Sequence, residues 1–320
     1  MEETIKKLLA DGRGLLAADE STHTIEKRFA ALGLTSTPEL NKKYREMLFT
    51  APGIENYISG VILFDETVRQ NLQKILEEKG IVPGIKVDGG LEPFDNSEEQ
   101  ITKVPENLEG KLGEYFGMGM RFTKWRAAIK ISDIFPTDSF LEEDLDRMVR
   151  FAGISQEKGF IPLVEPEVLL DGNHTTTRCA EISVKVWQIL FEKLNAANID
   201  LKNLILKTNM VLPGINSGVK AAPLEVAEAT LRSLKKAVPP EVGGIVFLSG
   251  GQTPDEATNN LNEIIKRKGD APWPISFSYS RALQNEPMEE WHGKEENVKS
   301  AQEVFIKRLE LVSKAERGEL

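Results

Sequence analysis

The stretch NLILKTNMV, residues 203–211, places one lysine inside an apolar run that has the pattern of a buried strand. Lys207 directly follows Leu204, Ile205 and Leu206, so we expect its side chain to lie away from water. Burying an unpaired ammonium is costly, and the group must therefore pair with an acid or lose its proton. A lysine that has lost its proton is a nucleophile, and the rest of the chain decides between these outcomes.

Seven other segments share the short and mostly apolar character of this one, and most are bounded by Gly or Pro. In chain order the predicted strands are 13–19, 59–64, 82–88, 121–130, 160–167, 203–210, 243–250 and 274–281. Helical patterns lie between them, for example at 67–80, 141–159, 180–198 and 223–238. Strict alternation of strand and helix predicts a parallel sheet that is covered by helices.

Eight such units in 320 residues match the count and length of a closed (β/α)8 TIM barrel. We expect this α/β barrel to form a single domain over residues 1–320. A doubly wound open sheet is the alternative, but it would be expected to carry a glycine-rich dinucleotide loop after its first strand. RGLLAADEST, residues 13–22, contains no such loop.

The composition, with 40% hydrophobic and 28% charged residues, is typical of a globular protein. A formal net charge of −10 argues against a general nucleic-acid binder, which needs a basic face. Cys179 is the only cysteine, so no internal disulfide can form, which suits a reducing cytosol. The first residues lack the apolar core of a signal peptide, and no apolar run approaches the roughly 20 residues of a membrane span. We therefore expect a cytoplasmic protein with no membrane or nucleic-acid partner.

Alternate residues of a barrel strand face the interior and the helix layer, so strand parity predicts where each polar side chain points. Leu204 and Leu206 should meet the helices, which places Ile205, Lys207 and Asn209 in the interior. The same test groups interior polar residues on four other strands: Glu165 with Glu167, Lys124 with Arg126, Lys86 with Asp88, and Asp19. Most of them fall near the C-terminal ends of their strands, where barrel enzymes have their active sites.

Two interpretations of Lys207 remain open on these residues. Paired with Glu165 or Asp19, it would be a structural lysine that holds the barrel closed. With Lys124 as a second inward ammonium, like charge and burial both favour the neutral amine. Glu165 and Asp19 would then act as acid and base beside a nucleophile, which is the equipment for a Schiff base with a ketone.

Two groups of residues are predicted to bind phosphate on either side of the lysine. LSGGQ, residues 248–252, ends the seventh strand with the Ser249 hydroxyl and with Gly250 and Gly251, which let a ligand approach the main chain. Alone this would be an ordinary glycine turn, but Arg281 at the end of the eighth strand adds a cation that can hold phosphate in a bidentate fork. The second group comprises Lys86, Arg28, Ser21 and Thr24. Two phosphate sites that flank a lysine indicate a bisphosphorylated sugar as the ligand.

Eight motifs, one on each predicted strand, make the chain resemble the class I fructose-bisphosphate aldolases over nearly its whole length. They are LLAADEST (15–22), GVILFDET (60–67), GIKVD (84–88), KWRAAIKI (124–131), VEPEVL (164–169), LKTNMV (206–211), FLSGGQ (247–252) and SYSRAL (278–283). The resemblance implies a barrel, usually tetrameric, that reversibly cleaves fructose 1,6-bisphosphate to dihydroxyacetone phosphate and glyceraldehyde 3-phosphate. It implies no metal ion and no cofactor.

The resemblance also implies a role for each matching residue. Lys207 is similar to the Schiff-base lysine of the family, and Glu165 to the carboxylate that dehydrates the carbinolamine, with Glu167 beside it. Asp19 resembles the group that handles the proton of the C4 hydroxyl. The remaining matches are Lys124 and Arg126 as active-site cations, Ser249, Gly250, Gly251, Ser280 and Arg281 for one phosphate, and Ser21, Thr24 and Lys86 for the other, with Arg28 near the phosphates.

Three positions depart from the family pattern. Thr208 stands where many relatives have a proline, a change that should be harmless. Ser280 replaces a glycine whose backbone helps to bind phosphate, so we expect a changed local geometry there. His23 also replaces a glycine, and we expect a solvent-exposed loop residue in preference to an extra phosphate donor.

Three other functions were weighed against the residues. A metal-dependent aldolase would need a cluster of His ligands, and His23, His174 and His292 are not predicted to lie together. Another lysine Schiff-base enzyme, such as a transaldolase, would explain Lys207 but not two phosphate sites. A non-catalytic scaffold barrel would leave the interior charges unexplained.

The last residues raise the question of how the enamine is protonated. Some relatives carry a C-terminal tail whose tyrosine assists this proton exchange, whereas this sequence ends AERGEL. Residues 297–316 are predicted to form an amphipathic helix, with only 317–320 free beyond it. Proton transfer to the enamine would then rest on barrel residues or water, with Glu165 as the expected donor.

Overall fold

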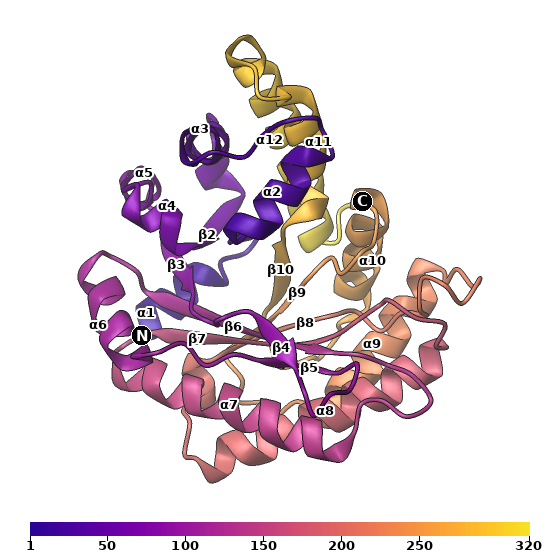
Figure 1. Cartoon of the computed structure of the whole chain (residues 1–320). Coiled ribbons are helices and arrows are strands. Elements are labelled where there is room, and N and C mark those ends of the chain that lie inside the picture. The colour runs from indigo at the N-terminus through magenta and orange to yellow at the C-terminus, as the bar shows by residue number, and fades with distance from the viewer.

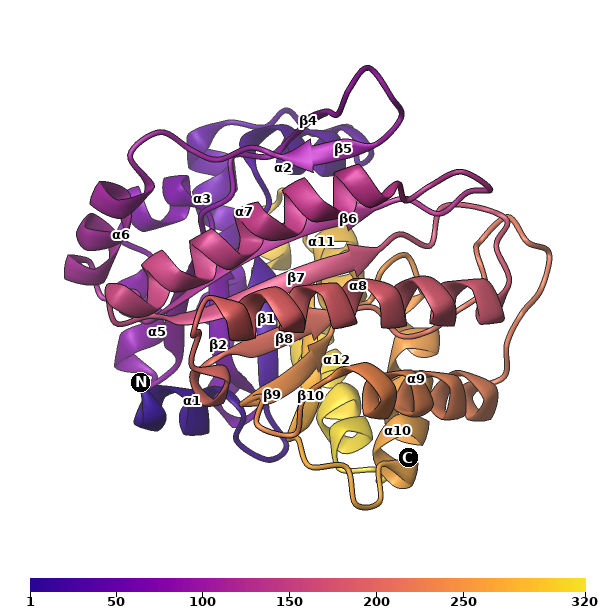
Figure 2. The ribbon, with the colours of Figure 1, turned by 90° about the horizontal axis from the view of Figure 1, so that it is seen from below.

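The computed structural model describes residues 1–320, and eight parallel strands close a barrel at its centre (Figures 1 and 2). The barrel strands are β1 (Gly14–Ala18), β2 (Ile58–Leu63), β3 (Val82–Lys86), β6 (Phe122–Ile129), β7 (Ile161–Val168), β8 (Ile205–Thr208), β9 (Gly244–Phe247) and β10 (Ile275–Tyr279). Each strand pairs with the next, and the β1–β10 and β3–β6 pairings complete the ring. The eight predicted strands and the predicted fold class are confirmed.

Helices surround the barrel and connect one strand to the next (Figure 1). They are α1 (Glu2–Leu8), α2 (Thr22–Ala30), α3 (Pro38–Phe49), α4 (Asp65–Arg69), α5 (Gln73–Glu78), α6 (Leu108–Gly117), α7 (Asp138–Glu157), α8 (Thr176–Ala196), α9 (Pro223–Ala237), α10 (Pro254–Arg267), α11 (Arg281–Trp291) and α12 (Val298–Glu316). Short 3-10 turns form η1 (Ile54–Asn56), η2 (Leu201–Asn203) and η3 (Glu295–Asn297). No helix is both long enough and apolar enough to cross a membrane.

Several of the helices that follow barrel strands begin at side chains that cap their free backbone N–H groups. Thr137 caps α7, Thr175 caps α8 and Thr253 caps α10, each accepting a bond from the third residue onward. Because each of these helices starts just after a strand ends, its N-terminus lies at the C-terminal mouth of the barrel. The partial positive charge of helix N-termini therefore favours anions at this mouth.

Two local predictions were incomplete. The pattern at 67–80 predicted one helix, but Asn71 has a φ of 60°, a left-handed conformation that ends α4 before α5 begins. The antiparallel pair β4 (Leu91–Pro93) and β5 (Gln100–Thr102), inserted between β3 and α6, was not predicted from the sequence. Its three-residue strands are too short to produce a clear alternation of apolar and polar residues.

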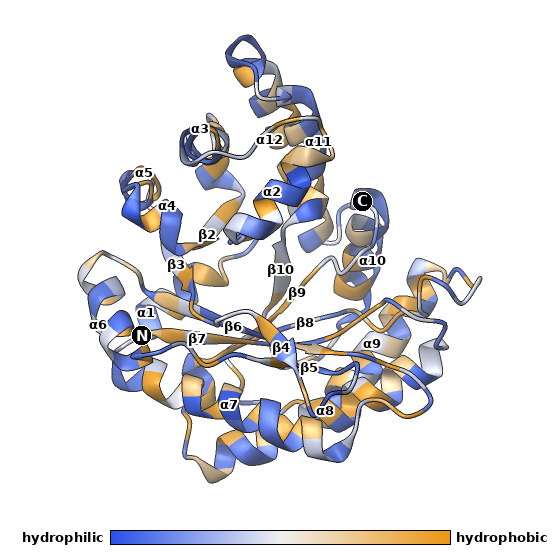
Figure 3. Cartoon of the chain, in the orientation of Figure 1, coloured by the Kyte–Doolittle hydropathy of each residue, from blue (hydrophilic) through white to orange (hydrophobic).

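Buried apolar side chains fill the N-terminal part of the barrel interior and the layer between strands and helices. The helices are coloured with hydrophobic and hydrophilic stretches in alternation, as expected of helices with one buried face (Figure 3). The interior cluster includes Leu15, Phe122 and Ile205, and α1 adds Ile5 and Leu8 beneath them. Phe122 is so large that a Cβ on Gly84 of the adjacent strand would lie 2.3 Å from its ring. Since this layer occupies the N-terminal half, the next inward residues of each strand form a separate layer nearer the mouth.

The chain terminus is held against the barrel wall and is not free, which corrects the prediction for 317–320. The backbone N–H of Leu320 donates to Asn262 Oδ1 at 3.1 Å, and its carbonyl accepts from the side chains of Asn262 and Lys266 on α10. Just before it, Glu316 accepts a bond from the Gly12 N–H at 2.7 Å. Gly12 leads into β1, so these contacts lie at the N-terminal end of the barrel, away from the mouth.

Candidate active site

Four charged residues meet inside the barrel directly above the apolar layer. Lys207 on β8 is 3% exposed, and its Nζ lies 3.0 Å from Glu165 Oε1 on β7. Lys124 on β6 has its Nζ 2.9 Å from Glu165 Oε2 and 3.0 Å from Asp19 Oδ2, just past β1. The Lys124–Asp19 contact is also a well-aligned hydrogen bond, whereas the contacts of Glu165 are ionic ones without that alignment. One carboxylate therefore lies between two ammonium groups, as strand parity predicted.

The charges of the cluster set its protonation state. Burial alone would raise the pKa of Asp19, but the charges of Lys124, Lys207 and Lys86 outweigh it and lower the pKa to about 2. Burial likewise opposes ionisation of Glu165, yet Lys124 and Lys207 hold its pKa below the ordinary value. Burial would lower the pKa of Lys124, but Asp19 and Glu165 raise it well above the usual range. At neutral pH the two acids are carboxylates and Lys124 is an ammonium.

The two inward lysines differ in their partners. Lys124 faces two carboxylates, Asp19 and Glu165, whereas Lys207 lies against Glu165 alone. Both interpretations left open by the sequence are therefore compatible with the geometry, because Lys207 is paired and also adjacent to a base that can take its proton. Lys124 is the more firmly held charge of the two.

Arg126 and Glu167 form a second ion pair one layer further toward the mouth. Arg126 Nε donates to Glu167 Oε2, and the charge of Glu167 is the main cause that raises the pKa of Arg126 above its usual range. The Arg126 side chain keeps about a third of its surface exposed, 32%. A cation at this position is thus accessible to a ligand that enters the barrel.

Asn209 does not point into the interior, which corrects the parity prediction. β8 ends at Thr208, so Asn209 lies outside the regular strand. Asn209 Oδ1 accepts from the Val168 N–H at 3.0 Å, and its Nδ2 donates to Ser183 Oγ of α8 at 3.5 Å. Parity holds only while the backbone stays extended, so it fails one residue past the end of a strand.

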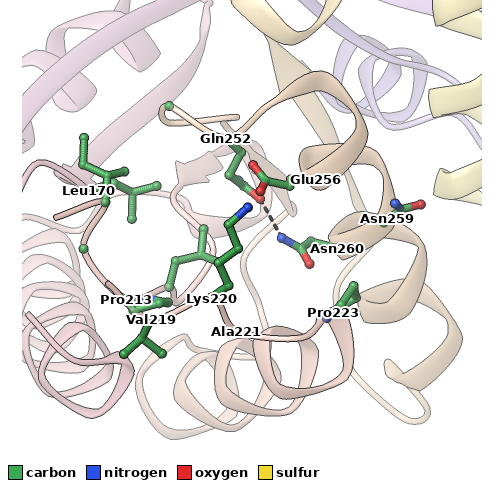
Figure 4. Close-up of a pocket in the computed structure, with 14 residues that line it drawn as sticks. Leu170, Pro213, Val219, Lys220, Ala221, Pro223, Gln252, Glu256, Asn259 and Asn260 are labelled. Carbon is green, nitrogen blue, oxygen red and sulfur yellow. Dashed lines mark hydrogen bonds between the residues drawn. The ribbon is translucent and has the colours of Figure 1, made fainter. Parts of the chain in front are cut away.

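The loop after β9 has the backbone conformation expected of a ligand-binding turn. Gly250 and Gly251 have φ values of 49° and 89°, which a residue with a side chain adopts only with strain. Gln252 braces the turn, since both its backbone N–H and its side-chain Nε2 donate to the Ser249 carbonyl at 3.0 Å. Behind the turn, Gln252 lines a cavity of about 260 Å³ together with Lys220, Glu256 and Asn260 (Figure 4).

Arg281 and Ser280 lie at the start of α11, beside the end of β10. Arg281 is exposed and has no carboxylate within 4.0 Å, so its guanidinium is free to bind an anion. Ser280 has φ and ψ of −108° and −85°, and its side chain makes contacts that a glycine could not make. Its Oγ donates to Glu20 Oε1 at 3.1 Å and accepts from Gln284 Nε2 at 3.1 Å, so the side chain is bound within the protein.

The second predicted phosphate group is brought together only in part. Lys86 and Ser21 line one cavity of about 470 Å³ at the mouth, where Lys86 Nζ also lies 3.3 Å from Asp88 Oδ1. Ser21 caps α2 and shares a hydrogen bond of 3.0 Å with Thr24. Arg28 does not line this cavity, because its guanidinium donates to Glu20 and to two side chains of α11.

His23 is exposed, as expected from the sequence, but it lies in the first turn of α2 and not in a loop. His174 is buried with both ring nitrogens unpaired. Sequence reasoning missed Glu20, which lies between Asp19 and Ser21 in the LLAADEST motif and contacts Arg28 and Ser280. Its position between two assigned residues was the signal that could have identified it.

Comparisons with known proteins agree with this geometry. A family model described as "Glycolytic: Fructose-bisphosphate aldolase class-I" matches residues 1–320. Cytosolic fructose-bisphosphate aldolase 4 of Arabidopsis thaliana is 42% identical over 314 residues, which cover 96% of this chain and 80% of the relative. The cytoplasmic isozyme of Cicer arietinum is 44% identical over 315 residues, covering 96% of this chain and 88% of the relative.

A solved structure is also similar over nearly the whole chain. The fructose-bisphosphate aldolase of Plasmodium falciparum superposes with a TM-score of 0.97 at 41% identity, covering 99% of this chain and 94% of that chain. Sequence identity at this level, together with a shared barrel, excludes a different fold and excludes an unrelated family of Schiff-base lysine enzymes. The chain belongs to the class I fructose-bisphosphate aldolase family.

Proposed function

We propose that this aldolase cleaves fructose 1,6-bisphosphate through a Schiff base on Lys207. The observation that carries the assignment is the difference between the two lysines: Lys124 is held by two carboxylates, and Lys207 faces only Glu165. The reaction begins when Lys207 passes a proton to Glu165 and its neutral amine attacks the C2 carbonyl of the sugar. Glu165 then returns a proton to the C2 hydroxyl of the carbinolamine, which leaves as water and gives the iminium.

The iminium supplies the driving force for breaking the C3–C4 bond. Asp19 takes the proton of the C4 hydroxyl, C4 becomes the aldehyde of glyceraldehyde 3-phosphate, and the bonding electrons move into the iminium to form an enamine. Because a carboxylate with a pKa of about 2 is a weak base, this transfer depends on the electron sink at Lys207. Lys124, which is hydrogen-bonded to Asp19, stabilises the negative charge that develops on the C4 oxygen as its proton leaves.

Product release repeats the first steps in reverse. Asp19 passes the C4 hydroxyl proton to water, and Glu165, a carboxylate after the dehydration, takes up a proton from water. Glu165 is then the proposed donor of the proton that reaches C3 of the enamine, and water hydrolyses the resulting iminium to free dihydroxyacetone phosphate and Lys207. Arg126 and Glu167, at the mouth, would hold the substrate hydroxyls and orient Glu165. This assignment of roles follows the family resemblance and the short distances within the cluster.

The phosphates of the substrate would bind at the two loops on either side of the cluster. One site combines the Ser249 hydroxyl, the turn at Gly250 and Gly251, the Ser280 backbone and the Arg281 guanidinium. The other combines Ser21, Thr24 and Lys86, with Arg28 nearby. Free positive charge at Arg281, a left-handed glycine turn and the helix N-termini at the mouth all favour an anion here.

The assembly and location of the protein are inferred from its relatives. We propose a homo-oligomer, a tetramer as is usual in the family, and a cytoplasmic location. Its named relatives include cytosolic and chloroplastic enzymes.

Borohydride trapping tests the covalent step. Reduction in the presence of dihydroxyacetone phosphate should produce a stable adduct, and mass spectrometry should locate it on the peptide that contains Lys207. Lys207→Met should abolish the adduct, whereas the matched variant Lys124→Met should still form it more slowly. An adduct on Lys124, or cleavage that a chelator abolishes, would refute the proposal.

A further inference from the structure

Glu20 is a buried carboxylate at the mouth that no step of the proposed reaction uses. It follows Asp19 at the end of β1, and its side chain is 5% exposed. Oε1 accepts from Arg28 Nη1 at 2.5 Å and from Ser280 Oγ at 3.1 Å. Oε2 is buried and has no hydrogen-bond partner. An unsatisfied buried acceptor is unfavourable for stability, so a contribution to folding does not by itself explain this residue.

The contacts of Glu20 connect the two loops that are proposed to bind phosphate. Its main chain lies between Asp19 and Ser21, on the loop after β1. Its side chain bonds Ser280, which directly precedes Arg281 on the loop after β10. A rigid link between these loops fixes the separation of two anion sites, and a bisphosphate must occupy both at once.

Neighbouring side chains hold this link in one position. Gln284 donates to Ser280 Oγ at 3.1 Å and to the Ala17 carbonyl at 2.7 Å, and its Oε1 accepts from the Tyr44 hydroxyl at 2.9 Å. The buried Arg45 donates to the backbone carbonyl of Glu20 at 3.0 Å. Both the carboxylate and the serine hydroxyl are thereby restricted to the geometry in which they meet.

We infer that Glu20 is a positioning residue that couples the two phosphate loops, acting on one through Arg28 and on the other through the Ser280 hydroxyl. The inference rests on the proposed function, since it concerns the binding of the same bisphosphate. Arg28 is the only cation within 4.0 Å of the Glu20 carboxylate, so removing the negative charge of Glu20 releases the Arg28 guanidinium. A glycine at position 280 could not make the contact, so the coupling depends on the serine hydroxyl.

The test compares a substrate with two phosphates and a substrate with one. Glu20→Gln keeps the shape and the acceptor but removes the charge, and should raise KM for fructose 1,6-bisphosphate about tenfold while kcat changes less than about threefold. KM for fructose 1-phosphate should change by less than about twofold, because one phosphate does not depend on the spacing of the loops. Glu99→Gln is the matched control, since Glu99 is equally buried and accepts a hydroxyl bond from Thr137 far from both loops. It should leave both KM values unchanged.

Two further measurements make the result decisive. Ser280→Ala is the milder variant if Glu20→Gln fails to fold, and it should also raise KM for the bisphosphate selectively. The double variant, with both Glu20→Gln and Ser280→Ala, should raise KM for the bisphosphate by less than the product of the two single increases, because both substitutions act through one contact. Affinity for unreactive hexitol 1,6-bisphosphate, measured by calorimetry, gives the same comparison without turnover. Equal KM increases for both substrates, or additive effects, would overturn the inference. A different outcome would count against the proposed function alone. In it, the wild type neither cleaves fructose 1,6-bisphosphate nor forms the borohydride adduct, but the Glu20 and Ser280 variants still have non-additive effects on the binding of hexitol bisphosphate.

Discussion

Lys124→Met is the change that most directly tests the charge cluster, because methionine keeps most of the side-chain volume and removes the ammonium. Asp19 has a pKa of about 2 against an ordinary value of 3.8. At 1.36 kcal/mol for each pKa unit this corresponds to about 2.5 kcal/mol of preference for the ionised form in the folded state. Lys124 is the largest source of that preference, and it also faces Glu165. We therefore expect the variant to lose about 3 kcal/mol of unfolding free energy at pH 7.

The loss should depend on pH in a defined direction. A carboxyl with a lowered pKa in the folded state contributes stability above its unfolded pKa of 3.8, and that contribution disappears as the pH falls toward 2. In the variant, burial acts on Asp19 with fewer cations against it, so its pKa rises above that of the unfolded chain and it takes up a proton at a higher pH than in the wild type. Protonation removes the unpaired buried charge of Asp19. The difference in unfolding free energy between variant and wild type should therefore shrink by about 1 kcal/mol between pH 7 and pH 4.

Urea unfolding at the two pH values measures both quantities. Adding Asp19→Asn to Lys124→Met provides the control, because the double variant has no carboxylate at position 19 and should lose most of the pH dependence. A difference that stays the same at pH 7 and pH 4 would refute the reasoning. It would show that Lys124 stabilises the barrel through packing and not through its charge.

Three further predictions concern catalysis and the chain terminus. Glu165→Gln should lower kcat about 10²–10⁴-fold with a much smaller effect on substrate affinity, since proton transfer acts in the transition state; unchanged turnover in steady-state assays would move the role to Asp19 or Glu167. Arg281→Ala should raise KM for the bisphosphate more than for an unphosphorylated ketose, and equal losses would indicate a structural arginine. Carboxypeptidase removal of residues 317–320 should leave the rate of substrate cleavage within about twofold of the wild-type rate, because these residues contact α10 at the end of the barrel opposite the mouth. A large loss of cleavage activity with an intact fold would contradict that placement.

Strand parity accounts for most of what the sequence predicted correctly. Once the alternation of strand and helix indicated a barrel, a period of two placed Lys124, Glu165 and Lys207 on interior faces, and all three lie there. The position of each residue along its strand then predicted that they meet near the mouth. Both steps depend only on regular backbone geometry, which is why they are reliable without any knowledge of contacts.

The incorrect predictions at the site concern residues whose side-chain direction is not set by the geometry of a strand. Asn209 follows the last residue of β8, and its direction is set by bonds to Val168 and α8, not by parity. Arg28 was grouped with Lys86 because both are cations near the mouth, but the buried carboxylate of Glu20 holds it toward α11. Pairings across loops depend on three-dimensional distances that no local pattern in the sequence encodes.

The choice between the two interior lysines illustrates the same limit. From the sequence, Lys124 and Lys207 are both inward lysines in apolar strands, and burial acts on both. Only their partners distinguish them, because Asp19 at the end of β1 reaches Lys124 and leaves Lys207 with Glu165 alone. Two carboxylates raise the pKa of Lys124 well above its usual range, whereas the Lys207 Nζ lies 3.0 Å from a carboxylate oxygen of Glu165 alone. We propose that Asp19, by holding Lys124 as an ammonium, directs the covalent chemistry to Lys207, and Asp19→Asn should then weaken this discrimination as well as the handling of the C4 proton.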